Sequence, residues 1–160
     1  MLEESEMERK IINWEDMDKY LAGVMEYRFV DYVEVQGNEA WGRKLASSQD
    51  WYFKMHFPGN PVMPGVFIME VMMQTGVFII TTREEMTEKL MMFHACKSMR
   101  IFKSVRPGDV VQSHVVLKSY RQGIASYSGV ATVDGEKVCE MEFTLVAPGE
   151  LKKISPKVEG

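Results

Sequence analysis

The longest apolar stretch of the chain covers residues 66–82 and predicts a buried helix. Apolar side chains occupy nearly every helical face of this stretch, which is the pattern of a helix enclosed on all sides. Glu70 interrupts it. A carboxylate in such surroundings needs a partner or a chemical role, because the desolvation of a charged group is costly.

Four strand-like segments follow this helix and predict a β meander, at residues 91–102, 110–120, 124–133 and 137–147. They are rich in β-branched and aromatic residues, and turn sequences separate them. The Asp134-Gly135 pair is the strongest hairpin signal. The last segment alternates apolar and polar residues, and its apolar set is Cys139, Met141, Phe143 and Leu145. We therefore expect a sheet with one dry face, against which the apolar helix packs.

The first part of the chain predicts one helix and two strands. Residues 6–21 carry apolar side chains among many charges and predict an amphipathic helix. Residues 27–35 and 40–48 predict two strands joined by a turn. We expect one α+β domain over residues 1–147 with this N-terminal helical extension, and a disordered lysine-rich tail over residues 148–160.

Composition agrees with one compact domain. The 160 residues are 46% hydrophobic and 26% charged, with a net charge of −4, which is ordinary for a soluble globular protein. The apolar run is shorter than the about 20 residues that a bilayer span needs, and the acidic first residues are unlike a signal peptide. We expect a cytoplasmic protein with no membrane partner. Cys96 and Cys139 lack metal-type spacing and are expected to be two buried free thiols.

The loop before the helix combines several groups that proton transfer requires. Residues 56–66 read His-Phe-Pro-Gly-Asn-Pro-Val-Met-Pro-Gly-Val. His56 is a titratable base, and Glu70 follows fourteen positions later as a buried acid. The prolines stiffen the loop, and Gly65 leaves the backbone N–H groups of the first helical turn open to a ligand. These parts suit proton transfer beside a developing oxyanion.

These residues resemble the active-site motif of a known family. Residues 56–66, with Glu70 and Gln74, are similar to the motif of the beta-hydroxyacyl-[acyl-carrier-protein] dehydratases of type II fatty acid synthesis. The likeness extends over residues 27–147 and includes three further blocks, at residues 50–53, 106–109 and 129–135. It implies an α+β hotdog fold, an antiparallel sheet wrapped around the central helix. It also implies a lyase that converts (3R)-3-hydroxyacyl thioesters of acyl carrier protein to trans-2-enoyl thioesters, in fatty acid or polyketide-like biosynthesis.

The resemblance assigns roles to single residues. His56 takes the C2 proton, and Glu70 protonates the leaving C3 hydroxyl. The Gly65 N–H holds the thioester oxygen, the Val62 carbonyl orients His56, and Gln74 belongs to the same group of orienting residues. In the family the histidine and the acid of one site come from different subunits, which implies a homodimer or a trimer of such dimers.

Two departures from the family pattern affect the substrate channel. Met55 stands where the family has a small glycine before the histidine, and the Pro-His-Arg block expected within residues 23–31 is missing. We assign the channel to Met55, Phe57 and Met63. A side chain at position 55 is expected to narrow it.

The implied partner is acyl carrier protein, which is acidic. Residues 97–121 hold six cations and one carboxylate, a net charge of +5. The candidate docking residues among them are Lys97, Arg100, Lys103, Arg106 and Arg121, with Lys118 in the same run. A charge run is also explained by a solvated face. No phosphate loop or nucleotide fingerprint is present, and we expect no cofactor, no metal and no nucleic acid.

Three alternatives remain open at this point. A hotdog thioesterase would use a carboxylate and a water but does not need the histidine loop. A catalytically silent subunit would bind acyl chains or support a partner, and would not need both His56 and Glu70. A metal site at His56, Glu70 and His94 lacks the clustered spacing of metal ligands. His94 and His114 are interpreted as structural.

Overall fold

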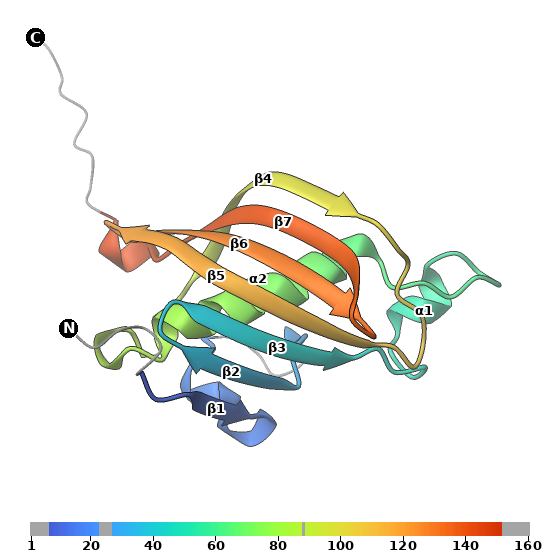
Figure 1. The fold of residues 1–160 in the computed structure, drawn as a ribbon, viewed down its shortest axis with the longest axis horizontal. Helices are drawn as coiled ribbons and strands as arrows, with labels where there is room; N and C mark the ends of the chain where they lie inside the picture. Colours follow the sequence, from blue (N-terminus) through green and yellow to red (C-terminus); the bar gives the residue numbers. More distant parts are fainter. Residues whose placement is uncertain (1–6, 23–26, 88, 152–160) are drawn as a thin grey trace, which may run out of the picture.

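The computed structural model describes residues 7–22, 27–87 and 89–151. In this part of the chain, seven strands form one antiparallel sheet in the order β1-β2-β3-β5-β6-β7-β4. The sheet curves around α2 (Gly65–Thr81), which crosses its concave face (Figure 1). The predicted α+β arrangement, an antiparallel sheet around a long apolar helix, is confirmed.

The four later strands lie close to their predicted positions, whereas the strand predicted over residues 27–35 begins only at Tyr32 and the one predicted over residues 40–48 ends at Leu45. The strand bounds are β2 (Tyr32–Gln36), β3 (Glu39–Leu45), β4 (Met92–Ile101), β5 (Val110–Arg121), β6 (Ile124–Val133) and β7 (Glu136–Val146). Asp134 and Gly135 both have a positive φ, 50° and 78°, as a two-residue hairpin turn of this kind requires. The alternation of the last strand is confirmed, since its apolar set is at most 3% exposed.

The amphipathic helix predicted over residues 6–21 is wrong. Residues Lys10–Asn13 form strand β1, which pairs antiparallel with β2, and Trp14–Lys19 form the 3-10 helix η2. Pairing with β2 satisfies the backbone of β1 and buries Ile12, which is 1% exposed. Short polar side chains such as Asn13 and Asp16 favour turns over helix interiors. Tertiary pairing therefore overrides the helical periodicity.

Close packing fixes α2 against β3 and β5. Thr75 on the helix shares a buried hydrogen bond of 2.6 Å with Ser113 on β5. Gly42 on β3 lies against both hydroxyls, and a Cβ at this position would collide with them. The missing side chain allows the helix to approach the sheet, and this contact sets the position from which Glu70 projects.

A short helix that the sequence analysis did not predict, α1 (Tyr52–Met55), precedes His56. Its Tyr52 is buried, and the ring lies 5.2 Å from that of Phe67 in the first turn of α2. Phe29 stacks on Phe67 at 4.8 Å. This aromatic cluster joins the histidine loop to the start of the central helix.

Cys139 and Cys96 differ in environment. Cys139 is buried, and this burial raises the pKa of its thiol to about 11. Cys96 is exposed on β4, so the prediction of two buried thiols is wrong for Cys96. Both are free cysteines.

The C-terminal tail lies largely outside the described residues, which end at residue 151. Two further 3-10 helices are η4 (Glu84–Met86) and η5 (Pro148–Glu150). The first residues of the predicted tail are therefore folded, and Glu150 pairs with Lys89 at 2.6 Å.

Among the described residues, no helix combines the length and apolar character that crossing a membrane would require.

Candidate active site

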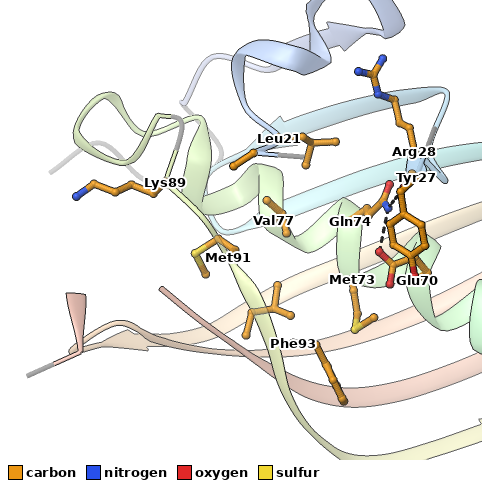
Figure 2. A pocket seen from close by; sticks show the side chains of 12 residues that line it. Leu21, Tyr27, Arg28, Glu70, Met73, Gln74, Val77, Lys89, Met91 and Phe93 are labelled. Carbon is orange, nitrogen blue, oxygen red and sulfur yellow. Dashed lines mark hydrogen bonds between the residues drawn. The ribbon is translucent and has the colours of Figure 1, made fainter. Parts of the chain in front are cut away.

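Glu70 is held by one buried amide. Gln74, one turn further along α2, donates from Nε2 to Glu70 Oε1 at 2.9 Å (Figure 2). The same Nε2 donates to the carbonyl of Tyr27 at 2.8 Å, and Gln74 Oε1 accepts from the N–H of Phe29 at 2.8 Å. Gln74 therefore ties the carboxyl to the backbone of the segment before β2.

A cavity of about 480 Å³ opens beside Glu70 (Figure 2). Of the α2 residues that line it, Glu70 comes first and Val77 last, so the cavity follows the helix for about 10 Å. The full lining is Leu21, Ala22, Tyr27, Arg28, Glu70, Met73, Gln74, Val77, Lys89, Met91, Phe93 and Leu145. Most of these side chains are apolar, which suits a hydrocarbon chain.

The electrostatic environment favours a protonated Glu70. Burial raises the pKa of its carboxyl above the usual value, and the hydrogen bond from Gln74 offsets part of this rise. Tyr27 lines the same cavity, and the pKa of its phenol is raised by burial and by the neighbouring Glu70 carboxylate. A carboxyl that keeps its proton can act as a general acid.

His56 is oriented by a backbone carbonyl. It follows the last residue of α1, and its Nδ1 lies 3.1 Å from the carbonyl oxygen of Val62. A ring that donates from Nδ1 to this oxygen leaves Nε2 as the proton acceptor. Phe57, the next residue, has a φ of 51°, which is uncommon for a side chain of this size. The loop is thus held in a strained turn that determines the direction of the imidazole.

The N-terminus of α2 carries no side-chain cap. Pro64 is the N-cap residue, and within the described part of the chain no side-chain hydrogen bond caps the helix. The space that a Cβ on Gly65 would fill is occupied by Cδ1 of Ile101, from the end of β4. Glycine at position 65 therefore leaves room for the end of the Ile101 side chain, which would have to rotate if a Cβ were present.

The structure brings together some of the predicted site residues and separates others. Glu70 and Gln74 share one cavity, and His56 and Val62 form one loop. His56 is not among the residues that line the Glu70 cavity of the same chain. Met55 and Phe57 are 74% and 61% exposed, and Met63 is 3% exposed in the core. None of these three lines the cavity either.

The chain is similar in sequence to known proteins. Residues 25–142 match the FabA-like domain, and the chain is 41% identical over 110 residues to the 3-hydroxyacyl-[acyl-carrier-protein] dehydratase FabZ of Latilactobacillus sakei subsp. sakei (strain 23K), covering 69% of this chain and 79% of that protein. The chain belongs to the FabA-like dehydratase family. A second relative, the FabZ dehydratase of Bacillus cytotoxicus, is 39% identical over 145 residues, which cover 89% of this chain and 100% of the relative.

Solved structures of low sequence identity share the fold. The dehydratase heterocomplex ApeI:P from Xenorhabdus doucetiae matches with a TM-score of 0.71 at 19% identity, covering 82% of this chain and 90% of that chain. The predicted hotdog fold is thereby confirmed. The FabA-like match also places the histidine loop, α2 and most of the sheet inside one family domain.

The basic run of this FabA-like chain does not form one patch. Arg121 ends β5, whereas Arg106 precedes that strand by four residues, so the two lie about 40 Å apart along an extended chain. Lys97 pairs with Glu142 at 3.1 Å, and Lys103 pairs with Glu136. Arg106 donates to the Asn60 side chain at 3.1 Å, beside the histidine loop. Of the candidate docking residues, Lys103 and Arg106 therefore lie towards the His56 end of the sheet.

The remaining histidines lie outside the cavity. His94 is exposed on β4. His114 pairs with Glu39 and stacks on Trp41, with ring centroids 5.0 Å apart. Among the described residues, no group of three His, Cys, Asp or Glu side chains is placed to hold a metal ion.

Sequence reasoning missed part of the cavity wall. Leu21 and Ala22 come from the N-terminal segment, Met91 directly precedes β4, and Phe93 lies near the beginning of that strand. Tyr27 and Arg28 lie in the segment of residues 23–31, where the family's Pro-His-Arg block is missing. This departure from the family pattern was the signal that could have pointed to them. Hydrophobic periodicity did not identify these residues, because it reports burial within one element and not contact between distant elements.

Proposed function

We propose that this protein is a 3-hydroxyacyl-[acyl-carrier-protein] dehydratase of fatty acid biosynthesis, which removes water from (3R)-3-hydroxyacyl thioesters to give trans-2-enoyl thioesters. The observation that carries the proposal is the pair of oriented groups, His56 bonded through Nδ1 to Val62 and Glu70 bonded to Gln74 beside an apolar cavity. The relatives named above carry this activity in their names.

His56 is the base in this mechanism. With Nδ1 directed at the Val62 carbonyl, the free Nε2 removes the proton from C2 of the substrate. The C2–H electron pair becomes the new C2–C3 double bond as the C3–O bond breaks. Glu70 donates its proton to the departing hydroxide, which leaves as water. The raised pKa of Glu70 keeps that proton available.

The thioester oxygen gains negative charge as the C2 proton leaves. In our proposal the uncapped N-terminus of α2 stabilises it through the Gly65 N–H. A thioesterase would instead need an ionised carboxylate to activate water. A thioesterase has no need of a histidine oriented by the Val62 carbonyl, and the named relatives are dehydratases, so the dehydratase is the better supported of the two.

We further propose that the site is completed by a second copy of the chain. The Glu70 cavity of one chain lacks His56, and every residue of β4 except Met99 is exposed. Met92, Phe93 and Ile101 on this edge strand are each 48–49% exposed. A long edge strand with exposed apolar side chains is prone to aggregation unless another segment or chain packs against it. A two-fold dimer through β4 would cover it and bring His56 of one copy to Glu70 of the other. The trimer of dimers and the cytoplasmic location remain predictions.

The carrier protein is proposed to dock at the His56 end of the sheet. Arg106 lies there beside the loop that carries His56, and Lys103 precedes it by three residues and pairs with Glu136. Each contributes modest screened attraction to an acidic partner. Arg121 lies at the far end of β5 and is not part of this proposed surface.

The activity is tested with purified protein and a panel of 3-hydroxyacyl and enoyl thioesters of acyl carrier protein, followed by mass spectrometry. We expect interconversion of the two by addition or loss of one water. His56→Ala and Glu70→Gln should each lower turnover by about 100-fold or more while the fold is kept. Free carrier protein as the product would indicate a thioesterase, and a folded His56→Ala variant of wild-type activity would remove His56 from the mechanism.

The composite site is tested by complementation. His56→Ala and Glu70→Ala are unfolded, mixed in equal amounts and refolded together, with separately refolded samples as the control. Half of the dimers are then mixed, and each has one intact site, so about a quarter of wild-type activity should return. Proven subunit exchange without recovery would place the whole site within one chain.

A further inference from the structure

We propose that the N-terminal segment of residues 10–22 is a specificity wall of the substrate cavity, in which Leu21 sets the length of acyl chain that fits. This inference rests on the proposed function, since it names a substrate determinant of the same site. Leu21 lines the cavity together with Val77, the α2 residue of the lining that is furthest from Glu70 (Figure 2). Reacting groups meet Glu70, and the hydrocarbon chain extends away from it towards Leu21.

The lining changes character along the cavity. Beside Glu70 it offers polar groups, namely the Gln74 amide and the Tyr27 phenol. At the other end the lining includes the apolar side chains of Val77 and Met91, together with Lys89, whose ammonium group pairs with Glu150 (Figure 2). A ligand with a polar head and an apolar tail matches this order. The length of the apolar part then depends on the side chains that close it.

Leu21 is held firmly in place. Its N–H bonds to the carbonyl of Met17 at 3.0 Å, and Met17 is fully buried in the core. Tyr20 packs edge-on against Phe78 of α2, with ring centroids 6.3 Å apart. Ile12 is buried as well, where β1 pairs with β2. The wall is therefore anchored on both sides of η2.

Arg28 connects η2 to the Glu70 end of the cavity through a hydrogen bond, an ion pair and a ring contact. Its guanidinium donates to the carbonyl of Trp14 at 3.0 Å, pairs with Asp18, and lies 4.9 Å from the Trp14 ring centroid. The Arg28 side chain is only 4% exposed. The neighbouring Tyr27 carbonyl accepts from Gln74, which holds Glu70. One short segment thus connects η2 to the catalytic acid.

The wall lies outside the shared family domain. The FabA-like match begins at residue 25, whereas Leu21 and the anchoring residues of η2 precede it. Arg28 stands in the segment where the family's Pro-His-Arg block is missing. Leu21 therefore adds to the cavity a side chain that lies outside the residues matched by the FabA-like domain.

The test varies the size of residue 21. Leu21→Ala enlarges the cavity and Leu21→Phe reduces it. The control is Ile124→Ala, because Ile124 is 40% exposed on β6 and lies outside both the cavity lining and residues 10–22. The measured quantity is the ratio of kcat/KM for acyl chains two to four carbons longer than the wild-type optimum to kcat/KM for the optimum itself. We expect this ratio to rise about tenfold in Leu21→Ala and to fall about tenfold in Leu21→Phe. Ile124→Ala should keep the wild-type profile.

A second measurement separates this inference from the proposed function. Binding of unreactive saturated acyl-pantetheine thioesters from four to twelve carbons is measured by calorimetry on the same four proteins. A shifted binding profile in the Leu21 variants without any turnover would support the proposed role of Leu21 and contradict the proposed dehydratase activity. If the Leu21 variants are folded and active and their turnover and binding profiles are unchanged, the proposed role of Leu21 is contradicted, whereas the proposed dehydratase activity is not affected.

Discussion

Gln74 Nε2 lies 2.9 Å from Oε1 of Glu70, one helical turn away, and the same amide also bonds to the backbone of residues 27 and 29. One side chain therefore connects the candidate acid to the segment that leads into β2. Gln74 is 8% exposed, so water does not replace these bonds readily when the amide is lost.

Replacing Gln74 should change the acid without removing it. In Gln74→Ala, Glu70 loses the hydrogen bond that lowers its pKa, so the pKa assigned to Glu70 in the pH profile of kcat/KM should move upward. We expect kcat to fall about tenfold, because the carboxyl is no longer positioned. The pH–rate profile is the measurement, and Gln112→Ala on the exposed outer face serves as the control. An unmoved profile would indicate a purely structural Gln74.

Glu70 should also make stability depend on pH. Its folded pKa is raised above the ordinary value of 4.5, so between these two values the folded protein binds more protons than the unfolded one. The free energy of unfolding contributed by this group is present below 4.5 and is lost as pH rises through the folded pKa. Glu70→Gln should remove this dependence and be more stable than wild type at neutral pH. Urea unfolding from pH 4 to pH 8 measures it, with the exposed Glu85→Gln as the control; parallel curves for wild type and Glu70→Gln would contradict the shift.

Gly65 and Ile101 should be energetically coupled. In Gly65→Ala the new methyl group meets Cδ1 of Ile101, which must rotate at a cost of about 0.5–1.5 kcal/mol. Ile101→Val removes only that carbon and should relieve the strain, so the double variant should be more stable than additivity predicts. Denaturant unfolding of the four proteins forms the cycle. Strict additivity would mean that the two residues do not touch in solution.

Met55→Gly tests the channel prediction across the proposed dimer. Met55 is 74% exposed and does not line the cavity of its own chain, so its side chain reaches a substrate only through the other copy. We expect the preferred chain length to shift, with an effect of about 1–3 kcal/mol on the ratio of kcat/KM values. The comparison uses short and long acyl thioesters. An identical profile in a folded, active variant would place Met55 outside the channel.

Much of this protein follows from local sequence. The apolar run of α2, the Asp134-Gly135 turn and the alternation of β7 identify their elements, because helical and strand periodicity and turn chemistry act between neighbouring residues. The residues from His56 to Glu70 likewise indicate the chemistry, since the base, the acid and the helix N-terminus lie within fifteen positions.

Only the tertiary structure decided which groups meet. Residues 10–13 have a helical pattern yet pair with β2, because burial of Ile12 and edge hydrogen bonds outweigh a weak local preference. His56 lies outside the Glu70 cavity of its own chain, while Leu21 lies in its wall. Such contacts depend on how the chain closes over long sequence separations, and packing, not the pattern within any one segment, determines them.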